Sequence, residues 1–403
     1  MSRPNLALTL LPLLAAMACG GGSGNSGTNP SATSIADSTP SSQALSVELS
    51  NSPSTAMPSS WAGMMTPGGG PGDFPPVIIG ADGCHPHLFL RTEAVSRRLN
   101  RHLYKFLGRI DRLIAENPSI DTSGEMVWEK VFEDGIDARF TITKTAPLTY
   151  SWLLELRQGT TGDFTTVFSG DIDRTSAQGP HQGKGDMRLD LTALQSVVKN
   201  EPASGVIQVS FDVTSSSRTL VMDAAGVVWD TDGDPDDLAP VAPRNAHYVY
   251  LAEKGKGGSL KAADQMIFLC PANPTLARSD VNLVHRWYDL SDGSVHGRSD
   301  ARLENGQLTS TEQAVGVTCH SLPAREPPTP MASSTLGLAV EGYWLIKLED
   351  GGTVVAGSVH QAGSPDACDP VFGPVPASDS TQDDFDFSSV NFEDQTPYPF
   401  PGM

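Results

Sequence analysis

Residues 136–143 read Ile-Asp-Ala-Arg-Phe-Thr-Ile-Thr, an alternation of apolar and polar side chains with a period of two. Neighbouring side chains of a β-strand point to opposite faces of its sheet, so this stretch predicts a strand with one face on a core and one in water. The alternation returns in residues 150–156 and 207–213, and clusters of Gly, Asp, Ser and Pro between such runs are typical of turns. Further strands are predicted at 164–168, 186–191, 219–222, 248–251, 265–270, 283–290, 314–320, 343–348 and 353–359, and a short helix at 192–198.

One long amphipathic helix is predicted ahead of these strands, at about residues 86–117, where Asn117-Pro118 ends it. Its apolar residues recur at steps of three and four, the period of a helix face. They are Val95, Leu99, Leu103, Phe106, Ile110 and Leu113. The remaining surface is basic and offers candidate partner-binding residues: Arg97, Arg98, Arg101, Lys105, Arg109 and Arg112. Such a face suits an anionic surface, but in a chain of formal net charge −20 we expect it to meet carboxylates of its own fold.

These elements predict an α+β, mostly-β fold in which the helix packs on an extended antiparallel sheet. Periodicity leaves two shapes open, a curved sheet or half-barrel and a sandwich. The body is expected to span residues 77–376, with a possible sub-boundary in the Asp- and Pro-rich stretch 230–243. Residues 377–403 interleave acidic and aromatic side chains without Lys or Arg, which predicts a disordered tail. The alternative is that this tail docks across the basic helix.

The first 18 residues have the parts of an export signal: Arg3, an apolar run over 6–16, and small residues at the end. Ala16-Met17-Ala18-Cys19 resembles the lipobox of bacterial outer-membrane lipoproteins, a resemblance that covers residues 3–22. It implies a diacylated Cys19 at the mature N-terminus, and Gly20 in the next position implies the outer membrane. The competing interpretation is a plain A-x-A cleavage site and secretion. The body resembles uncharacterised exported lipoproteins and carries no motif that transfers a function.

Residues 19–76 are rich in Gly, Ser, Pro, Thr and Asn, and no Lys or Arg occurs between Arg3 and Arg91. A segment with so few large apolar residues does not bury enough surface to offset its ordering entropy. It is therefore predicted to be a disordered tether between the anchor and the body.

Five cysteines are present, and acylation of Cys19 would leave an even set of four. In an oxidising compartment these four predict two disulfides. Three pairings are possible; we favour the one that ties the ends of the body together. It joins Cys84 to Cys368 and Cys270 to Cys319. Zinc is disfavoured because the chain lacks the paired C-x-x-C or H-x(3–5)-H spacings of structural zinc sites.

An acidic loop near residue 230 is the candidate ion site, and calcium is the one cofactor considered. Its aspartates stand at alternate positions, as in calcium loops of the D-x-D-x-D-G type, where hard oxygens bind the ion. They are Asp230, Asp232, Asp234 and Asp236. Pro235 stands in place of the usual glycine, and Val241 in place of the bidentate glutamate. An acidic turn is therefore the competing interpretation.

The chain contains no G-x-S-x-G, H-E-x-x-H or Walker motif, so we expect a non-enzymatic protein. Asp173 with His181 and His285 with Asp289 are the acid–base pairs that the spacing suggests. Nucleic acid is excluded as a partner because its phosphates repel so acidic a chain. The sequence predicts a lipid-anchored cell-envelope protein whose β-rich body binds a partner or an apolar ligand such as a lipid. The alternatives are a calcium-assisted carbohydrate- or protein-recognition module and an envelope hydrolase.

Overall fold

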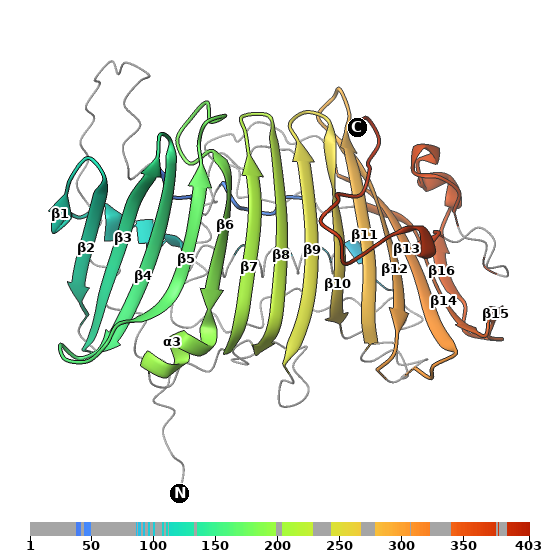
Figure 1. Ribbon diagram of the computed structural model, residues 1–403. Coiled ribbons are helices and arrows are strands. Elements are labelled where there is room, and N and C mark those ends of the chain that lie inside the picture. The colour runs from blue at the N-terminus through green and yellow to red at the C-terminus, as the bar shows by residue number, and fades with distance from the viewer. Residues whose placement is uncertain are drawn as a thin grey trace, which may run out of the picture.

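The computed structural model describes residues 38–41, 44–49, 115–132, 135–198, 204–228, 243–266, 279–306, 308–322, 340–375, 378 and 385–403, and isolated positions between 86 and 114. Within this part of the chain one antiparallel sheet of 16 strands organises the molecule (Figure 1). The strand order follows the chain from β1 to β15, and β16 pairs with β14 beside β15. The predicted meander is therefore confirmed.

The strands of the first half are β1 (Ile120–Asp121), β2 (Glu125–Val131), β3 (Ile136–Ala146), β4 (Thr149–Gln158), β5 (Thr165–Asp173), β6 (Gly183–Asp190), β7 (Ser204–Val213) and β8 (Ser217–Val228). The second half contains β9 (Arg244–Glu253), β10 (Gly257–Met266), β11 (Ser279–Asp289), β12 (Val295–Glu304), β13 (Glu312–Leu322), β14 (Val340–Asp350), β15 (Thr353–Val354) and β16 (His360–Gly363). Helix α3 (Leu191–Val197) confirms the short predicted helix, and the carboxylate of Asp190 caps it by accepting from the Ala193 N–H at 2.8 Å. The 3₁₀ turns are η3 (Pro365–Ala367), η4 (Pro370–Phe372) and η5 (Phe387–Ser389).

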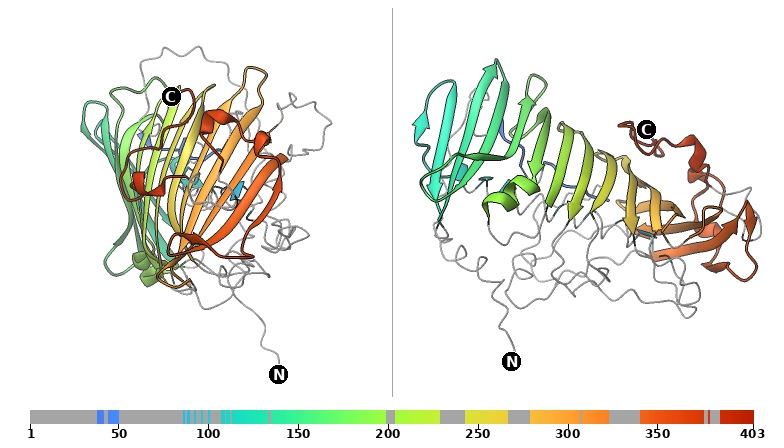
Figure 2. Two further views of the ribbon diagram at one scale, coloured as in Figure 1. Left: turned by 90° about the vertical axis from the view of Figure 1, so that its right-hand side faces the viewer. Right: turned by 60° about the horizontal axis from the view of Figure 1, so that its bottom comes forward.

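The sheet curves along its length and does not close on itself (Figure 2). The α+β, mostly-β prediction is thus confirmed in its curved-sheet form. Strand β12 was not predicted, because Arg298, Ser299 and Asp300 interrupt its apolar pattern although all three are buried. The strand predicted over 353–359 is limited to the two residues of β15.

The main core lies on one face of the sheet, called here the inner face. Alternate strand residues such as Phe140, Trp152 and Tyr250 form one apolar cluster across the sheet. Described positions between 88 and 114 are helical and join this cluster through Leu88, Phe89, Leu107, Ile110 and Leu113. The predicted helix therefore packs on the sheet at these positions. Its basic residues Arg97, Arg98, Arg101, Lys105, Arg109 and Arg112 lie outside the described residues.

Residues 44–49, called here the N-terminal strap, also lie on the inner face, behind the strands in Figure 1. Leu45, Val47 and Leu49 are buried at every second position. The side chain of Asn100 bonds both the N–H and the carbonyl of Val47 at 2.7 Å, as a neighbouring strand would. The prediction of a disordered tether over 19–76 is therefore wrong for the strap, because its alternating apolar residues find a place in the core.

Residues 385–403, called here the tail, cover the opposite, outer face and cross in front of β10 to β12 in Figure 1. Phe387 and Phe392 form a second cluster with Val284 and Val315, which point away from the inner core. The prediction of a disordered tail is wrong for these residues. The alternative, that the tail docks across the basic helix, is also wrong for them, because their contacts are with the outer face of the sheet. Its aromatic side chains bury enough surface to order a segment that its charge alone would leave in solvent.

Among the described residues a disulfide joins Cys319 of β13 to Cys368, with an S–S distance of 2.03 Å. Both predicted pairings are therefore wrong. Cys319 points to the outer face, where residues near η3 fold back against Val317, Tyr343 and Leu345. That packing sets Cys368 beside Cys319. Cys84 and Cys270 lie outside the described residues.

Candidate functional site: the charged outer face of the sheet

The outer face divides into two regions. From β3 to β8 it carries charged side chains that no described segment covers, and we call this region the acidic face. Strand register places its charges in rows across neighbouring strands: Asp137, Arg139, Glu155, Arg157, Asp171, Asp173, Lys184, Asp186, Arg188, Asp212 and Asp223. From β9 to β14 the outer face is covered by the tail and by residues 365–375.

At the β3–β4 end of the acidic face the charges neutralise one another. The guanidinium of Arg139 donates to Glu155 at 2.7 Å, and that of Arg157 donates to Asp137 at 2.6 Å. Phe164 lies between the two guanidinium groups, whose carbons are 4.3 and 4.2 Å from its ring centroid. Stacking and ion pairing together stabilise this end of the face and leave it little net charge.

At the centre of the acidic face the charges are not neutralised. Asp171 of β5 lies directly opposite Asp186 of β6, and both side chains are exposed. Within the described part of the chain neither carboxylate forms an ion pair, and Asp186 accepts a hydrogen bond from Ser210. Partial burial, and next the charge of Asp186, raise the pKa of Asp171. This central pair is a site of concentrated negative charge.

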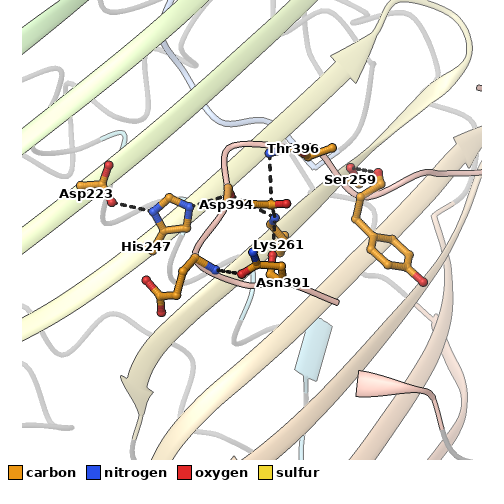
Figure 3. A network of polar contacts seen from close by, with 9 residues as sticks. Asp223, His247, Ser259, Lys261, Asn391, Asp394 and Thr396 are labelled. Carbon is orange, nitrogen blue, oxygen red and sulfur yellow. Dashed lines mark hydrogen bonds and ion pairs between the residues drawn. The ribbon is translucent and has the colours of Figure 1, made fainter. Parts of the chain in front are cut away.

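The acidic face ends at His247 of β9, where the covered region begins. Its Nδ1 lies 2.6 Å from a carboxylate oxygen of Asp223, and its Nε2 lies 3.0 Å from the carbonyl oxygen of Asp394 in the tail (Figure 3). The neighbouring ammonium of Lys261 is buried and donates to the carbonyls of Asn391 at 2.7 Å and Asp394 at 3.1 Å and to the Asp394 carboxylate. The hydroxyl of Ser259 donates to the carbonyl of Tyr398 at 2.6 Å. Strands β9 and β10 thus hold the tail mainly by its backbone carbonyls.

Beneath the tail the outer face is rich in buried cations. The guanidinium of Arg286 pairs with the carboxylate of Asp300 at 3.1 Å. Three aromatic rings surround it, with centroids 5.4, 5.4 and 5.5 Å from its central carbon: those of Phe372, Phe385 and Tyr398. Arg298 donates to the same carboxylate at 2.7 Å and to the carbonyls of Gly373 and Pro374 at 3.1 and 2.8 Å. These cations fasten the two covering segments to the sheet.

A second polar cluster lies at the rim of the covered region, where Tyr288, His296 and Asp369 meet. The Tyr288 hydroxyl donates to Asp369, and the His296 Nδ1 lies 3.4 Å from the same carboxylate oxygen. Burial, and then the Asp369 carboxylate, raise the pKa of Tyr288 to about 12. In the described part of the chain no serine or cysteine hydrogen-bonds His296. Sequence analysis missed this cluster because its members come from three separate segments.

The predicted acid–base pairs are not brought together as pairs. His285 instead has its Nδ1 2.9 Å from the Ser299 hydroxyl, and His181 has its Nδ1 2.6 Å from the carbonyl of Thr39. His285 stacks with His320 at a ring-centroid distance of 5.3 Å. On the inner face Phe89 also stacks with His320, and their ring centroids are 3.9 Å apart. Complete burial holds the pKa of His285 well below its usual range and lowers that of His320 to about 3. Both rings are therefore neutral parts of the core.

The other predicted sites lie outside the described residues: Cys19 and the aspartates Asp230, Asp232, Asp234 and Asp236. Where the structure does describe the chain, no three His, Cys, Asp or Glu side chains are grouped to hold a metal ion. In the same residues no helix has the length and apolar character to span a membrane. Comparisons of the chain with protein-family models, curated proteins and solved structures found no match.

Proposed function

We propose that this chain is a lipid-anchored cell-envelope protein whose non-enzymatic β-rich body binds a cationic partner through its acidic face. The anchor would be the acylated Cys19, with the outer membrane as its location. The observation that carries the proposal for the body is the opposed pair Asp171 and Asp186, which is exposed and forms no ion pair with a described residue.

The inner face supports a partner-binding body over a lipid carrier. A carrier would need its apolar strand residues free to line a cavity. Here the strap packs against them, and Tyr250 donates to the Glu48 carbonyl at 2.8 Å while accepting from the Glu48 N–H at 3.1 Å. The apolar side of the sheet is thus occupied by the chain itself in this region. Among the described residues no segment covers the acidic face, which is therefore the broad surface of the sheet that we propose for the partner.

Electrostatics define the class of partner. Two carboxylates directly opposite each other in a sheet repel, at a cost to folding that an approaching cation would relieve. A formal net charge of −20 adds a long-range field that attracts cations and speeds their association. We therefore propose a basic protein or peptide segment as the partner.

The anchor and the body are tested separately. Mass spectrometry of protein from its native membrane should find an acylated Cys19 as the N-terminal residue, and Cys19→Ala should release the protein from the membrane. An unmodified Cys19 on a soluble product contradicts the anchor.

For the body, the probe is a tetralysine peptide titrated onto the purified protein at low salt. Asp171→Asn with Asp186→Asn should weaken its binding at least about twofold and reduce the salt dependence, because screened surface charges each contribute roughly 0.2–1 kcal/mol. The matched control is Asp292→Asn, an exposed acid on the turn between β11 and β12. Equal binding by the double variant and the control contradicts the acidic face as the binding surface.

A further inference from the structure

We propose that protonation of His247 holds the tail on the sheet, so that the tail is a pH-sensitive cover over the cations of the outer face. The proposal rests on the two oxygen atoms that flank the imidazole. Asp223 lies at Nδ1 at 2.6 Å, and the Asp394 carbonyl lies at Nε2 at 3.0 Å (Figure 3). A carboxylate and a carbonyl oxygen only accept hydrogen bonds.

A neutral histidine carries one N–H and one bare nitrogen, which is itself an acceptor. In either neutral tautomer one of the two contacts would therefore set a lone pair against an oxygen lone pair at hydrogen-bonding distance. The imidazolium form donates to both oxygens. The docked tail is thus matched to the protonated ring.

Release of the tail removes this requirement. The Nε2 then meets water, which accepts or donates, and the Asp223 side chain, about half exposed at 51 %, is free to turn away. The docked state consequently binds protons more tightly than the released state. By linkage, docking is favoured as the pH falls through the range in which histidine gains its charge, and is weakened as the pH rises.

The other charged groups that face His247 belong to the tail, β8 and β10. From the tail, Asp394 is held by Lys261, whose hydrogen bond is the largest cause lowering the pKa of Asp394, so its carboxylate stays ionised across that range. From β8, Asp223 supplies the carboxylate that the ring pairs with. From β10, the ammonium of Lys261 donates to the same Asp394 carbonyl that the ring contacts, so its charge opposes that of the imidazolium, and the carboxylates of Asp223 and Asp394 offset it.

Opening the cover would change the character of this half of the sheet. Lys261 would lose its acceptors in the tail, Arg286 would lose the rings of Phe385 and Tyr398, and Arg302 would lose Phe387 at 5.3 Å. A basic surface would then be exposed beside the acidic face. Protonation of one histidine would therefore decide whether the outer face presents mainly negative charge or charge of both signs.

The test is hydrogen exchange of the tail amides in the full-length protein, with rates corrected for intrinsic exchange at each pH. From about pH 5.5 to about pH 7.5 the protection of residues 385–403 should fall roughly tenfold, with about a hundredfold as the limit for one proton over two pH units. His247→Gln should remove this pH dependence, since its amide donates to Asp394 without titrating. Asp223→Asn should remove it independently, because a neutral ring then satisfies both neighbours.

The matched control is His360→Gln on β16, which should keep the dependence of the unaltered protein. Protection of the β10 to β12 amides reports that each variant is folded. A tail whose protection does not change with pH in the unaltered protein overturns the proposal, and so does an unchanged dependence in both His247→Gln and Asp223→Asn.

Discussion

Cys319 is bonded to Cys368, 49 residues further along the chain, and the bond fixes residues 365–375 on the outer face of β13 and β14. The segment that this cross-link fixes makes two further sets of polar contacts with the sheet. Asp369 meets Tyr288 and His296, and the carbonyls of Gly373 and Pro374 accept from Arg298. The disulfide therefore fastens this segment to the sheet at Cys368, and the buried Arg298 fastens it at Gly373 and Pro374.

Loss of this disulfide should destabilise the body. Replacing both cysteines by alanine should lower the free energy of unfolding by about 2–4 kcal/mol, because the unfolded chain regains the entropy of a long loop. Urea unfolding measures the effect. Non-reducing peptide mapping is the direct check of the pairing, and a Cys368 linked to Cys84 or Cys270 would contradict it.

Lys261→Met should release the tail and cost stability. The buried ammonium donates to two tail carbonyls and a carboxylate, and methionine fills its volume without replacing those donors. Acceptors left without partners cost about 1–3 kcal/mol, so we expect a loss of roughly 2–4 kcal/mol in urea unfolding. The matched control is Lys256→Met, where the paired ammonium is exposed and the expected change is under about 0.5 kcal/mol. Equal effects of the two substitutions would mean that the tail does not depend on Lys261.

Leu45→Ala should show that the strap belongs to the folded body. Leu45 is completely buried, so truncation leaves a cavity and should cost about 2–4 kcal/mol. Val371→Ala provides the comparison, since this apolar side chain is exposed and its loss should change little. Chemical denaturation of both variants decides the matter. A Leu45→Ala protein as stable as the unaltered one would return residues 44–49 to the tether.

His320 should make the protein less stable in acid. Its burial lowers the pKa to about 3 from an ordinary value of 6.5, so below pH 6.5 the unfolded chain binds a proton that the folded chain does not. Stability is therefore fully present above that pH and is lost as the pH falls toward 3, by up to about 1.4 kcal/mol per pH unit. His320→Phe, which keeps a ring beside Phe89, should reduce the slope of unfolding free energy against pH between about pH 6 and about pH 4 by roughly that amount. A wild-type slope in the His320 variant would show that this ring is protonated in the folded state.

The parts of the fold that were predictable are those encoded within one element. The period-two pattern of β3, β4 or β7 is contained within about ten residues of that strand, because the side chains of a strand alternate whatever the strand is paired with. The helical period near residue 110 is local in the same sense, and Ile110 and Leu113 lie in the core as it predicts. The short helix α3 is marked by its own cap at Asp190.

Strand β12 shows where a local pattern fails. Its outer-face residues Arg298 and Asp300 read as a solvated stretch, yet they are buried in the region that residues 365–375 and the tail cover, and they pair with each other at 2.7 Å. Polarity normally marks exposure, but a charge buried with a partner obeys a different rule. The covering residues Gly373 and Pro374 lie 75 and 76 residues along the chain from Arg298, so no window around β12 contains them.

By itself the sequence determined a β-rich meander, its helical partner and the strong negative charge of the protein. The tertiary structure alone decided which cysteines pair, which apolar runs outside the strands join the core, and which carboxylates face each other. The bonds between Glu48 and Tyr250, separated by 202 residues, and between Lys261 and Asn391, separated by 130, form only when the whole sheet is assembled. The reason is physical: alternation depends on neighbouring residues, whereas neutralisation or coverage of a side chain depends on what the rest of the chain brings to it.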